Sequence, residues 1–434
     1  MKNRLVALLR FSERYTKTDM VYLAKSGWWL TLGTITISVL SLLLYIIFAR
    51  VLTKEVYGTY QYLLSISAII GSLTLTGMNS AVARAVARGY EGTLKIAVEA
   101  QLRWGVIPFL VSLAGALYYF WNGNMVLGFG LVLISFLTPL ISALNTYSAF
   151  IQGKKDFKRG YFFGLLWNVP FYGALITISF FFPSALILLG VNLVVQAVML
   201  FFTYRATLKT FHPNTKVEPG ALLYGKHLSL MGVIGSLSNQ IDIVLAFHFL
   251  GAADTAIYSF ATAIPERLSG LFKFLPAAAL PKLSEKTPEQ VRGAFGSRIW
   301  VVVLLMFLFS GLYAATAPFI YHVLFPTYAS AVPYSQVYGL MIVASLSGLF
   351  TTALTASHKL RGLYIFSSVT PTVQLALQVL GTIFFGLWGL IIARLTSQIL
   401  SLLLSIFLLR KKGSVKRNNS LCALDGDQER IENS

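Results

Sequence analysis

The sequence predicts an all-α polytopic membrane protein, with about twelve transmembrane helices in two six-helix lobes. Its 434 residues are 56% hydrophobic and only 12% charged, whereas soluble proteins carry roughly 25% charged residues. The mean hydropathy is +0.70, and apolar runs of about 20 residues, each long enough to cross a hydrocarbon core, recur from end to end. Because lipid offers backbone groups no hydrogen-bond partner, such runs form helices.

The first element is a basic, partly amphipathic and cytoplasmic lead-in at residues 1–26. Its apolar run from Leu5 to Leu9 is short, and arginines follow it instead of the small residues of a cleavage site, so we expect no signal peptide. Apolar segments bounded by basic or polar loops then define the spans. The spans cover residues 27–49, 59–80, 104–121, 125–150, 161–182, 184–204, 225–249, 256–281, 299–318, 330–352, 364–385 and 387–409.

The basic residues alternate between the predicted loops as the positive-inside rule requires. Of the 35 lysines and arginines, only Arg50 and Lys54 fall in loops of one side, and nearly all the others fall in loops and termini of the opposite side. We therefore expect a multi-pass protein of the plasma (inner) membrane with both termini in the cytoplasm. The net charge of +19 forms no basic stripe, so we expect no nucleic-acid partner.

A short internal repeat divides the spans into two groups of six. Leu52 to Tyr60 follows the first span, Leu250 to Tyr258 follows the seventh, and each stretch begins with Leu and ends with Tyr. Both copies follow odd-numbered spans, as two parallel halves require. The expected boundaries are 27–204 for the N-terminal six-helix lobe, 205–224 for a cytoplasmic linker, 225–410 for the C-terminal six-helix lobe and 411–434 for a disordered cytoplasmic tail.

The deeply placed charges concentrate in the second predicted lobe. A charge near the middle of a bilayer costs about 2.5–3.5 kcal/mol on insertion scales, so such residues are candidates for function. With a rise of about 1.5 Å per helical residue, four of them fall in one layer of the outer half of this lobe. These four residues are Asp242, Glu266, Arg267 and Arg394.

Three short motifs carry a resemblance to a known family. They are Phe48 to Tyr60 after the first span, Thr76 to Arg84 after the second, and Gln240 to Asp242 followed by Leu250-Gly251 and Tyr258. Their order resembles that of the polysaccharide-transport (O-antigen flippase) family. That family belongs to the multidrug/oligosaccharidyl-lipid/polysaccharide (MOP) exporter superfamily.

The resemblance implies a MATE-like fold, with the two lobes around a central cavity. It also implies a function, the flipping of a polyprenyl-diphosphate-linked oligosaccharide from the cytoplasmic to the outer leaflet for surface polysaccharide biosynthesis. Transport of this kind proceeds by alternating access rather than by ATP hydrolysis. The partners would be the lipid-linked oligosaccharide, membrane lipids and the polysaccharide polymerase machinery.

Two interpretations of the deep charges follow. In the first, Asp242 or Glu266 pairs with Arg267 and fixes the packing of the seventh and eighth spans. In the second, the cations bind the substrate, because guanidinium groups hold phosphate oxygens in bidentate fashion. Arg267 and Arg394 would then bind the diphosphate, and a cytoplasmic entrance would be formed by Lys273, Lys25 and Arg84. Snorkelling of Lys273 and Arg394 to the interface, and a topology role for Lys25 and Arg84, are the alternatives.

Asp242 also suits a coupling site for Na⁺ or a proton, because a buried carboxylate among amide and hydroxyl groups can hold either. Such partners are available in the last two spans as Gln374, Gln378, Thr396 and Gln398. The arrangement resembles the second-lobe cation site of lipid II flippases, although the eleventh span here has no acidic residue. We expect no other cofactor and no metal centre.

Aromatic residues concentrate near the predicted span ends, with Trp28, Trp29 and Tyr57 among them. Interfacial anchoring is the ordinary role of such residues. Stacking of a few of them against sugar rings is the alternative.

Other functions fit the sequence less well. A drug/cation antiporter of the same superfamily would couple through a first-lobe carboxylate, and the first six spans contain no Asp or Glu. A membrane-embedded glycan polymerase or ligase would need a sizeable outer loop, and the predicted outer loops are short. No Gly-rich loop followed by Lys-Ser/Thr occurs, which excludes an ATP-driven pump in this chain. A structural scaffold would leave the charged layer unexplained, so we predict a transporter rather than an enzyme.

Overall fold

The computed structural model describes residues 20–272, 299–356 and 360–410. Within these residues all regular structure is helical, which confirms the all-α prediction. Most of the predicted lead-in and the whole of the predicted tail lie outside the described residues.

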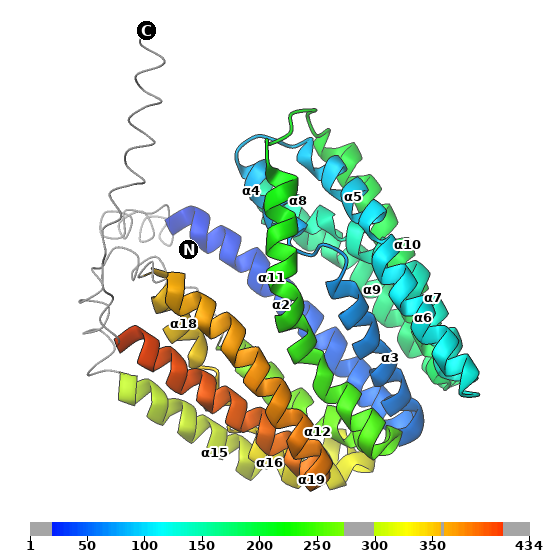
Figure 1. The fold of residues 1–434 in the computed structure, drawn as a ribbon, viewed down its shortest axis with the longest axis vertical. Coiled ribbons are helices and arrows are strands. Elements are labelled where there is room, and N and C mark those ends of the chain that lie inside the picture. The colour runs from blue at the N-terminus through cyan, green and yellow to red at the C-terminus, as the bar shows by residue number, and fades with distance from the viewer. Residues whose placement is uncertain (1–19, 273–298, 357–359, 411–434) are drawn as a thin grey trace, which may run out of the picture.

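The helices before residue 212 form a first group on one side of the molecule (Figure 1). They are α2 (Met20–Val51), α3 (Lys54–Ser72), α4 (Met78–Ala87), α5 (Thr93–Trp104), α6 (Val106–Trp121), α7 (Met125–Leu144), α8 (Thr146–Lys154), α9 (Phe157–Phe181) and α10 (Ala185–Phe211).

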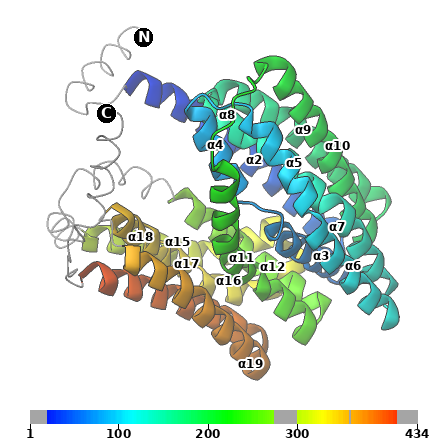
Figure 2. The same ribbon diagram turned by 45° about the horizontal axis from the view of Figure 1, so that its top comes forward.

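The helices after residue 220 form a second group, and α11 runs between the two groups in both views (Figures 1 and 2). They are α11 (Ala221–Leu245), the π-helical turn η1 (Ala246–Leu250), α12 (Ala252–Leu271), α15 (Ile299–Leu324), the 3-10 turn η2 (Pro326–Ala331), α16 (Val332–Tyr338), α17 (Met341–Ala344), α18 (Ser347–Ala356) and α19 (Leu360–Arg410).

Eight helical segments in the described part of the chain are long and apolar enough to cross a membrane. This confirms a multi-pass membrane protein. Three of the predicted spans, 59–80, 256–281 and 330–352, lie outside these segments. The count of twelve helices therefore stays a prediction.

The three exceptions have local causes. The predicted span 59–80 is divided between α3 and α4, and α12 carries acidic and basic side chains along its length. The predicted span 330–352 is broken into short helices, because Pro333 lies at the start of α16 and Gly339 ends it. Proline lacks a backbone donor and glycine is a poor helix former, so a continuous helix is disfavoured here.

The 51-residue helix α19 contains two predicted spans that turn back on each other at Gly386. Gly386 has φ +58°, in the left-handed region that favours glycine. This turn falls in the short loop that the sequence predicts between 364–385 and 387–409. The two arms approach closely next to the turn, where a side chain on Gly389 would overlap the carbonyl oxygen of Gly381.

The two groups meet at the end of the molecule where α2 ends and α12 begins, which we call the Leu52 end. Here α3 crosses α12 so closely that a side chain on Gly58 would overlap the carbonyl oxygen of Ala252. The rings of Tyr62 on α3 and Phe247 on η1 stack with centroids 4.1 Å apart. Backbone contact and ring stacking therefore join the groups at this end.

A second junction lies toward the opposite end, which we call the Glu218 end. The backbone N–H of Gly77 donates to Oγ of Ser229 on α11 at 2.9 Å, and a Cβ atom on Gly77 would lie 2.5 Å from the Ser229 nitrogen. Beyond it, the buried Glu218 carboxylate accepts hydrogen bonds from Arg88 at 2.8 Å and Arg84 at 3.4 Å. These ion pairs bind the segment between α10 and α11, which connects the two groups, to α4.

We expect Gly58→Ala to destabilise the junction between α3 and α12, because the added methyl group has no space beside Ala252. Overpacking of this kind costs about 1–3 kcal/mol. The thermal unfolding midpoint of the full-length protein in detergent measures the effect. The matched control is Gly173→Ala on α9, where a Cβ atom would find nothing within 4 Å. Equal midpoints for the two variants would contradict this account of the junction.

Candidate functional site

A buried ion pair joins α11 to the second arm of α19. Nη1 of Arg394 lies 3.3 Å from Oδ2 of Asp242, and the two side chains are 8% and 5% exposed. The hydroxyl of Tyr258 on α12 donates to the same carboxylate oxygen at 2.7 Å. Three helices of the second group therefore share one neutral polar cluster.

The carbonyl oxygen of Ser238, one helical turn before Asp242, extends this cluster. It accepts hydrogen bonds from Nη1 of Arg394 at 3.3 Å and from Nε2 of Gln374 at 2.6 Å. Gln374 lies on the first arm of α19, so both arms contact α11 at one carbonyl group. This arrangement pairs polar groups that would be costly to leave unpaired in a lipid-embedded bundle, although Nε of Arg394 is buried without a hydrogen-bond partner among the described residues.

Asp242 pairs with Arg394 and not with Arg267, the partner considered in the first interpretation of the deep charges. Arg394 takes that place, and Glu266 instead accepts a hydrogen bond from the hydroxyl of Tyr338 on α16 at 3.0 Å. Adjacent residues of a helix project about 100° apart. With Glu266 directed at α16, its neighbour Arg267 is directed away from the Asp242 cluster.

Arg267 faces the first group of helices. Its guanidinium carbon lies 4.2 Å from the ring centroid of Tyr45 on α2, which is a cation–π contact. Nη1 of Arg267 is buried and has no hydrogen-bond partner among the residues that the structure describes. A guanidinium group with an unused buried donor therefore lies at the boundary between the two groups of helices.

Glu266 is exposed, whereas Asp242, the other carboxylate of the predicted layer, is buried. Pro265 and Ser269, which neighbour Glu266 on the same helix, are buried as well. The structure thus brings Asp242 and Arg394 together, keeps Glu266 beside Tyr338, and places Arg267 against Tyr45 of the first group.

The structure describes the side chain of only one of the three cations predicted to form the cytoplasmic entrance. Arg84 pairs with Glu218 and lies over the ring of Tyr224 at 4.9 Å, so it fastens the connecting chain to α4. Lys25 belongs to α2, but its side chain is outside the described residues. Lys273 also lies outside the described residues.

The tyrosines of the layer are the partners that the sequence prediction missed. Tyr258 is named in the sequence only as a family landmark, and Tyr338 and Tyr45 were not singled out. A signal was available, because a tyrosine inside an apolar span usually needs a partner for its hydroxyl group. Which partner it takes depends on helix packing.

The residues around Asp242 fit a sodium site poorly in this arrangement. One carboxylate oxygen receives Arg394 and Tyr258, and the other accepts from the backbone N–H of Ile243 at 2.9 Å. A cation would have to displace the guanidinium group. Of the other proposed ligands, Gln374 binds Ser238, Thr396 is exposed, Gln398 is half-buried, and the amide atoms of Gln378 are buried without a partner. Coupling to Na⁺ or H⁺ stays a prediction.

We expect Arg394→Leu to destabilise the protein strongly, because the Asp242 carboxylate would stay buried without its counterion. Removing one partner of a buried pair costs about 3–5 kcal/mol. The double variant Asp242→Asn/Arg394→Leu removes both charges and should recover most of this loss. Thermal unfolding of the three proteins in detergent measures both effects. A double variant no more stable than the single one would show that the pair is not the source of the loss.

Comparisons with solved structures agree with this geometry at the level of the fold. A lipid II flippase, MurJ, in an inward closed conformation matches with a TM-score of 0.63 and 12% identity, over 88% of this chain and 87% of that one. A multidrug resistance MATE family transporter of the MOP superfamily matches in its outward-facing conformation with a TM-score of 0.58 and 14% identity, over 90% and 94%. Its inward-facing conformation matches with the same score and identity, over 89% and 97%. The chain therefore has the MATE-like fold of MOP-superfamily transporters, as the resemblance implies.

The sequence comparisons identify the family. A search of curated proteins gave no match. A family model described as polysaccharide biosynthesis protein matches residues 23–287, which run from the first turn of α2 to beyond α12 and include both junctions between the groups. Because this match covers more than half of the chain, the protein belongs to the polysaccharide biosynthesis protein family.

Proposed function

We propose that this protein is a flippase for a polyprenyl-diphosphate-linked oligosaccharide, which it moves from the cytoplasmic to the outer leaflet by alternating access. The observation that carries the proposal is the state of Arg267. It is a cation at the boundary of the two helix groups, and one of its buried donors has no partner in the described part of the chain. Membership of a polysaccharide biosynthesis family and a fold shared with a lipid II flippase support the same substrate class.

The chemistry of Arg267 suits a diphosphate. A guanidinium group is planar, and its N–H donors point outward in that plane, toward phosphate oxygens that match them in pairs. The ring of Tyr45 covers the face of the group, which leaves the edges free to donate. An unsatisfied buried donor is unfavourable, and an anionic head group would remove that cost.

Arg394 is proposed to have a different role from Arg267. Its charge is neutralised by Asp242 within the second group, so it supports the framework on which α12 presents Arg267. The second interpretation of the sequence predicts that both Arg267 and Arg394 bind the diphosphate. The ion pair favours Arg267 as the one that binds the diphosphate.

Alternating access would separate the two junctions in turn. The contact at Gly58 and the stacked Tyr62 and Phe247 would open toward one side of the membrane. The contact of Gly77 with Ser229 would open toward the other. Arg267 is attached to the second group and contacts the first through Tyr45, so a bound head group would meet both groups.

The membrane potential can drive this reaction without ATP. A potential of about 100 mV, negative inside, favours the outward movement of each negative charge by about 2.3 kcal/mol. Two charges on a diphosphate correspond to roughly 4–5 kcal/mol. In the proposed orientation both termini lie in the cytoplasm, which is the negative side of the membrane. The potential therefore favours movement of the diphosphate away from the side that holds the termini.

A drug/cation antiporter is the second candidate, because MATE family transporters share the fold. A cationic drug would be repelled by Arg267. A membrane-embedded polymerase or ligase is disfavoured, since the matched structures are transporters and a flippase.

We expect Arg267→Ala to abolish complementation in a strain that lacks its own flippase for the same glycan. Loss of one partner of a buried, hydrogen-bonded charge pair costs at least about 2 kcal/mol, which is roughly a thirtyfold loss of affinity. Complementation and the abundance of the protein in the membrane are measured together. Arg267→Lys keeps the charge but loses the bidentate geometry and should recover only part of the activity.

The matched control is Arg205→Ala on α10, because Arg205 is exposed and contacts the ring of Phe201 rather than the boundary between the groups. This variant should complement fully. Unimpaired complementation by Arg267→Ala at normal abundance would remove Arg267 from the mechanism.

A further inference from the structure

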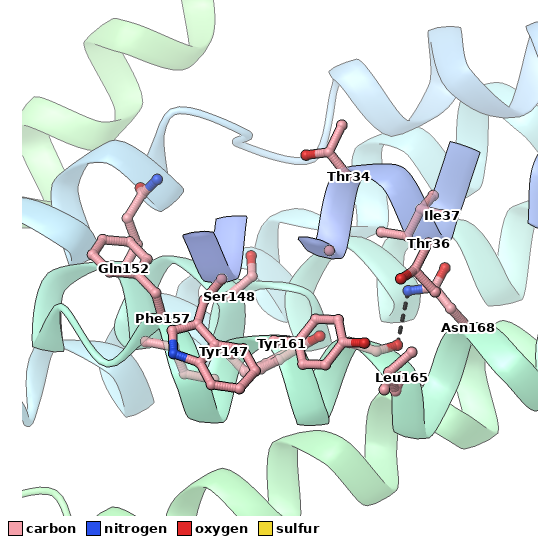
Figure 3. A pocket seen from close by; sticks show the side chains of 15 residues that line it. Thr34, Thr36, Ile37, Tyr147, Ser148, Gln152, Phe157, Tyr161, Leu165 and Asn168 are labelled. Carbon is pink, nitrogen blue, oxygen red and sulfur yellow. Dashed lines mark hydrogen bonds between the residues drawn. The ribbon is translucent and has the colours of Figure 1, made fainter. Parts of the chain in front are cut away.

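A second site lies within the first group of helices. A partly open cavity of about 280 Å³ is lined by residues of α2, α8 and α9. Figure 3 shows Gln152 and Phe157 at one end of it and Thr36 and Asn168 at the other. None of the charged residues of the Arg267 and Asp242 clusters lines this cavity.

Glycine residues create the space. Gly33 of α2 and Gly164 of α9 both line the cavity. A Cβ atom on Gly164 would come no closer than 4.0 Å to any neighbouring atom, and one on Gly33 would lie 3.5 Å from the ring of Tyr161. Larger side chains at these positions would therefore project into open volume. The cavity is just below the range of roughly 300–1,000 Å³ that holds drug-sized ligands, so it suits a ligand about the size of one sugar ring.

Aromatic rings form part of the wall. Trp29 and Tyr161 lie with their ring centroids 5.5 Å apart, and Phe157 and Tyr147 also line the space. The face of an aromatic ring carries partial negative charge, whereas the C–H bonds on one face of a pyranose ring carry partial positive charge. Aromatic walls of this kind therefore suit sugar rings, the alternative role that the sequence left open for Trp29.

The polar groups of the described lining are uncharged and offer both donors and acceptors. Asn168 donates its Nδ2 hydrogen to the carbonyl of Gly164, Ser148 donates to that of Asn145, and the hydroxyl of Thr36 donates to that of Leu32, all at 2.8 Å. With these donors used within their own helices, the side-chain oxygens remain as acceptors. A ligand for this cavity should therefore bring hydroxyl groups, which both donate to these oxygens and accept from the amide and tyrosine donors of the lining.

The proposed substrate has three parts, a diphosphate, a hydrocarbon chain and a glycan, and the chemistry of the lining favours one of them. A diphosphate would find no cation among the described lining residues, and Lys158 instead places its ammonium 6.0 Å from the ring centroid of Trp29. A hydrocarbon chain would displace water from the polar side chains without replacing its hydrogen bonds, which is unfavourable. A sugar supplies both hydroxyl donors and an apolar ring face.

We infer that the cavity between α2, α8 and α9 binds a sugar ring of the glycan that the protein transports. The inference rests on the proposed function, because the sugar belongs to the lipid-linked oligosaccharide. It adds a second contact for the substrate, on the first group of helices, to the contact that Arg267 makes from the second group.

Cysteine protection tests the inference directly. Cys422 is the only cysteine of the chain, so Cys422→Ser provides a background for Ser148→Cys, which places one thiol in the lining. The labelling rate of this thiol by a maleimide is measured on the full-length protein in nanodiscs. The probes are the lipid-linked oligosaccharide from the strain that the wild-type protein complements and undecaprenyl diphosphate, which carries no sugar.

Protection by the oligosaccharide lipid, without protection by undecaprenyl diphosphate, is the expected result. Equal protection by both lipids would assign the cavity to the hydrocarbon chain and overturn the inference. Protection by neither lipid would overturn it as well.

A pair of glycine variants tests the role of the cavity in transport. Gly164→Leu fills the space, and we expect it to slow transport about tenfold, the effect of losing roughly 1.4 kcal/mol of binding. Gly173→Leu lies on the same helix, where a Cβ atom finds nothing within 4 Å, and should transport at the wild-type rate. Thermal unfolding midpoints establish that both variants are folded.

The outcomes separate this inference from the function on which it rests. Normal transport by Gly164→Leu, in an assay where the wild-type protein is active, would overturn the sugar site alone. Absence of transport of any lipid-linked oligosaccharide by the wild-type protein would overturn the proposed function, and the sugar site with it.

Discussion

The ion pair between Asp242 and Arg394 determines how the other charges of the second helix group are used. In a lipid-embedded bundle a lone buried charge is costly, so each carboxylate must find a partner. Arg394 supplies that partner from α19, and Tyr258 adds a hydrogen bond from α12. Because Asp242 is neutralised inside the second group, Arg267 is not needed as its counterion and can face the first group across the boundary.

The ion pair between Asp242 and Arg394 also links helices that would move together as one body. It links α11, α12 and α19 by polar contacts within one group, whereas the contacts between the groups are of another kind. At the Leu52 end they consist of a close backbone approach at Gly58 and of ring packing, with Tyr57 and Phe260 at 4.7 Å between centroids. Non-directional contacts can be separated without leaving buried charges unpaired. At the Glu218 end the groups also share the hydrogen bond of Gly77 to Ser229, but the Asp242–Arg394 pair lies wholly within the second group. Keeping this pair within one group favours rigid-body motion of one group against the other.

Sequence reasoning recovered the features that depend on local patterns. Apolar runs located the membrane segments, and the turn at Gly386 fell in the predicted loop, where glycine readily adopts φ +58° with ψ −137°. Residue count along a helix gives the depth of the charges, and of the four predicted in one layer the structure pairs Asp242 with Arg394. The partner of Asp242 was not recovered, since it depends on how α19 is rotated against α11, which no local pattern encodes. The pairing of Arg84 with Glu218 and the cavity beside Gly164 escaped prediction for the same reason, as each is built from segments distant in sequence.

The distribution of chemistry between the two groups has a consequence for coupling. The second group offers a cation, Arg267, and the first offers an uncharged cavity with aromatic walls. A ligand shifts a conformational equilibrium only if it binds the two states with different affinity. A substrate that has both a diphosphate and a sugar can contact both groups at once only when they are suitably placed, so its affinity depends on their relative position. A free sugar or a bare diphosphate lacks this dependence. Selection of the complete lipid-linked glycan, and the coupling of its binding to the motion of the two groups, would then have a single physical origin.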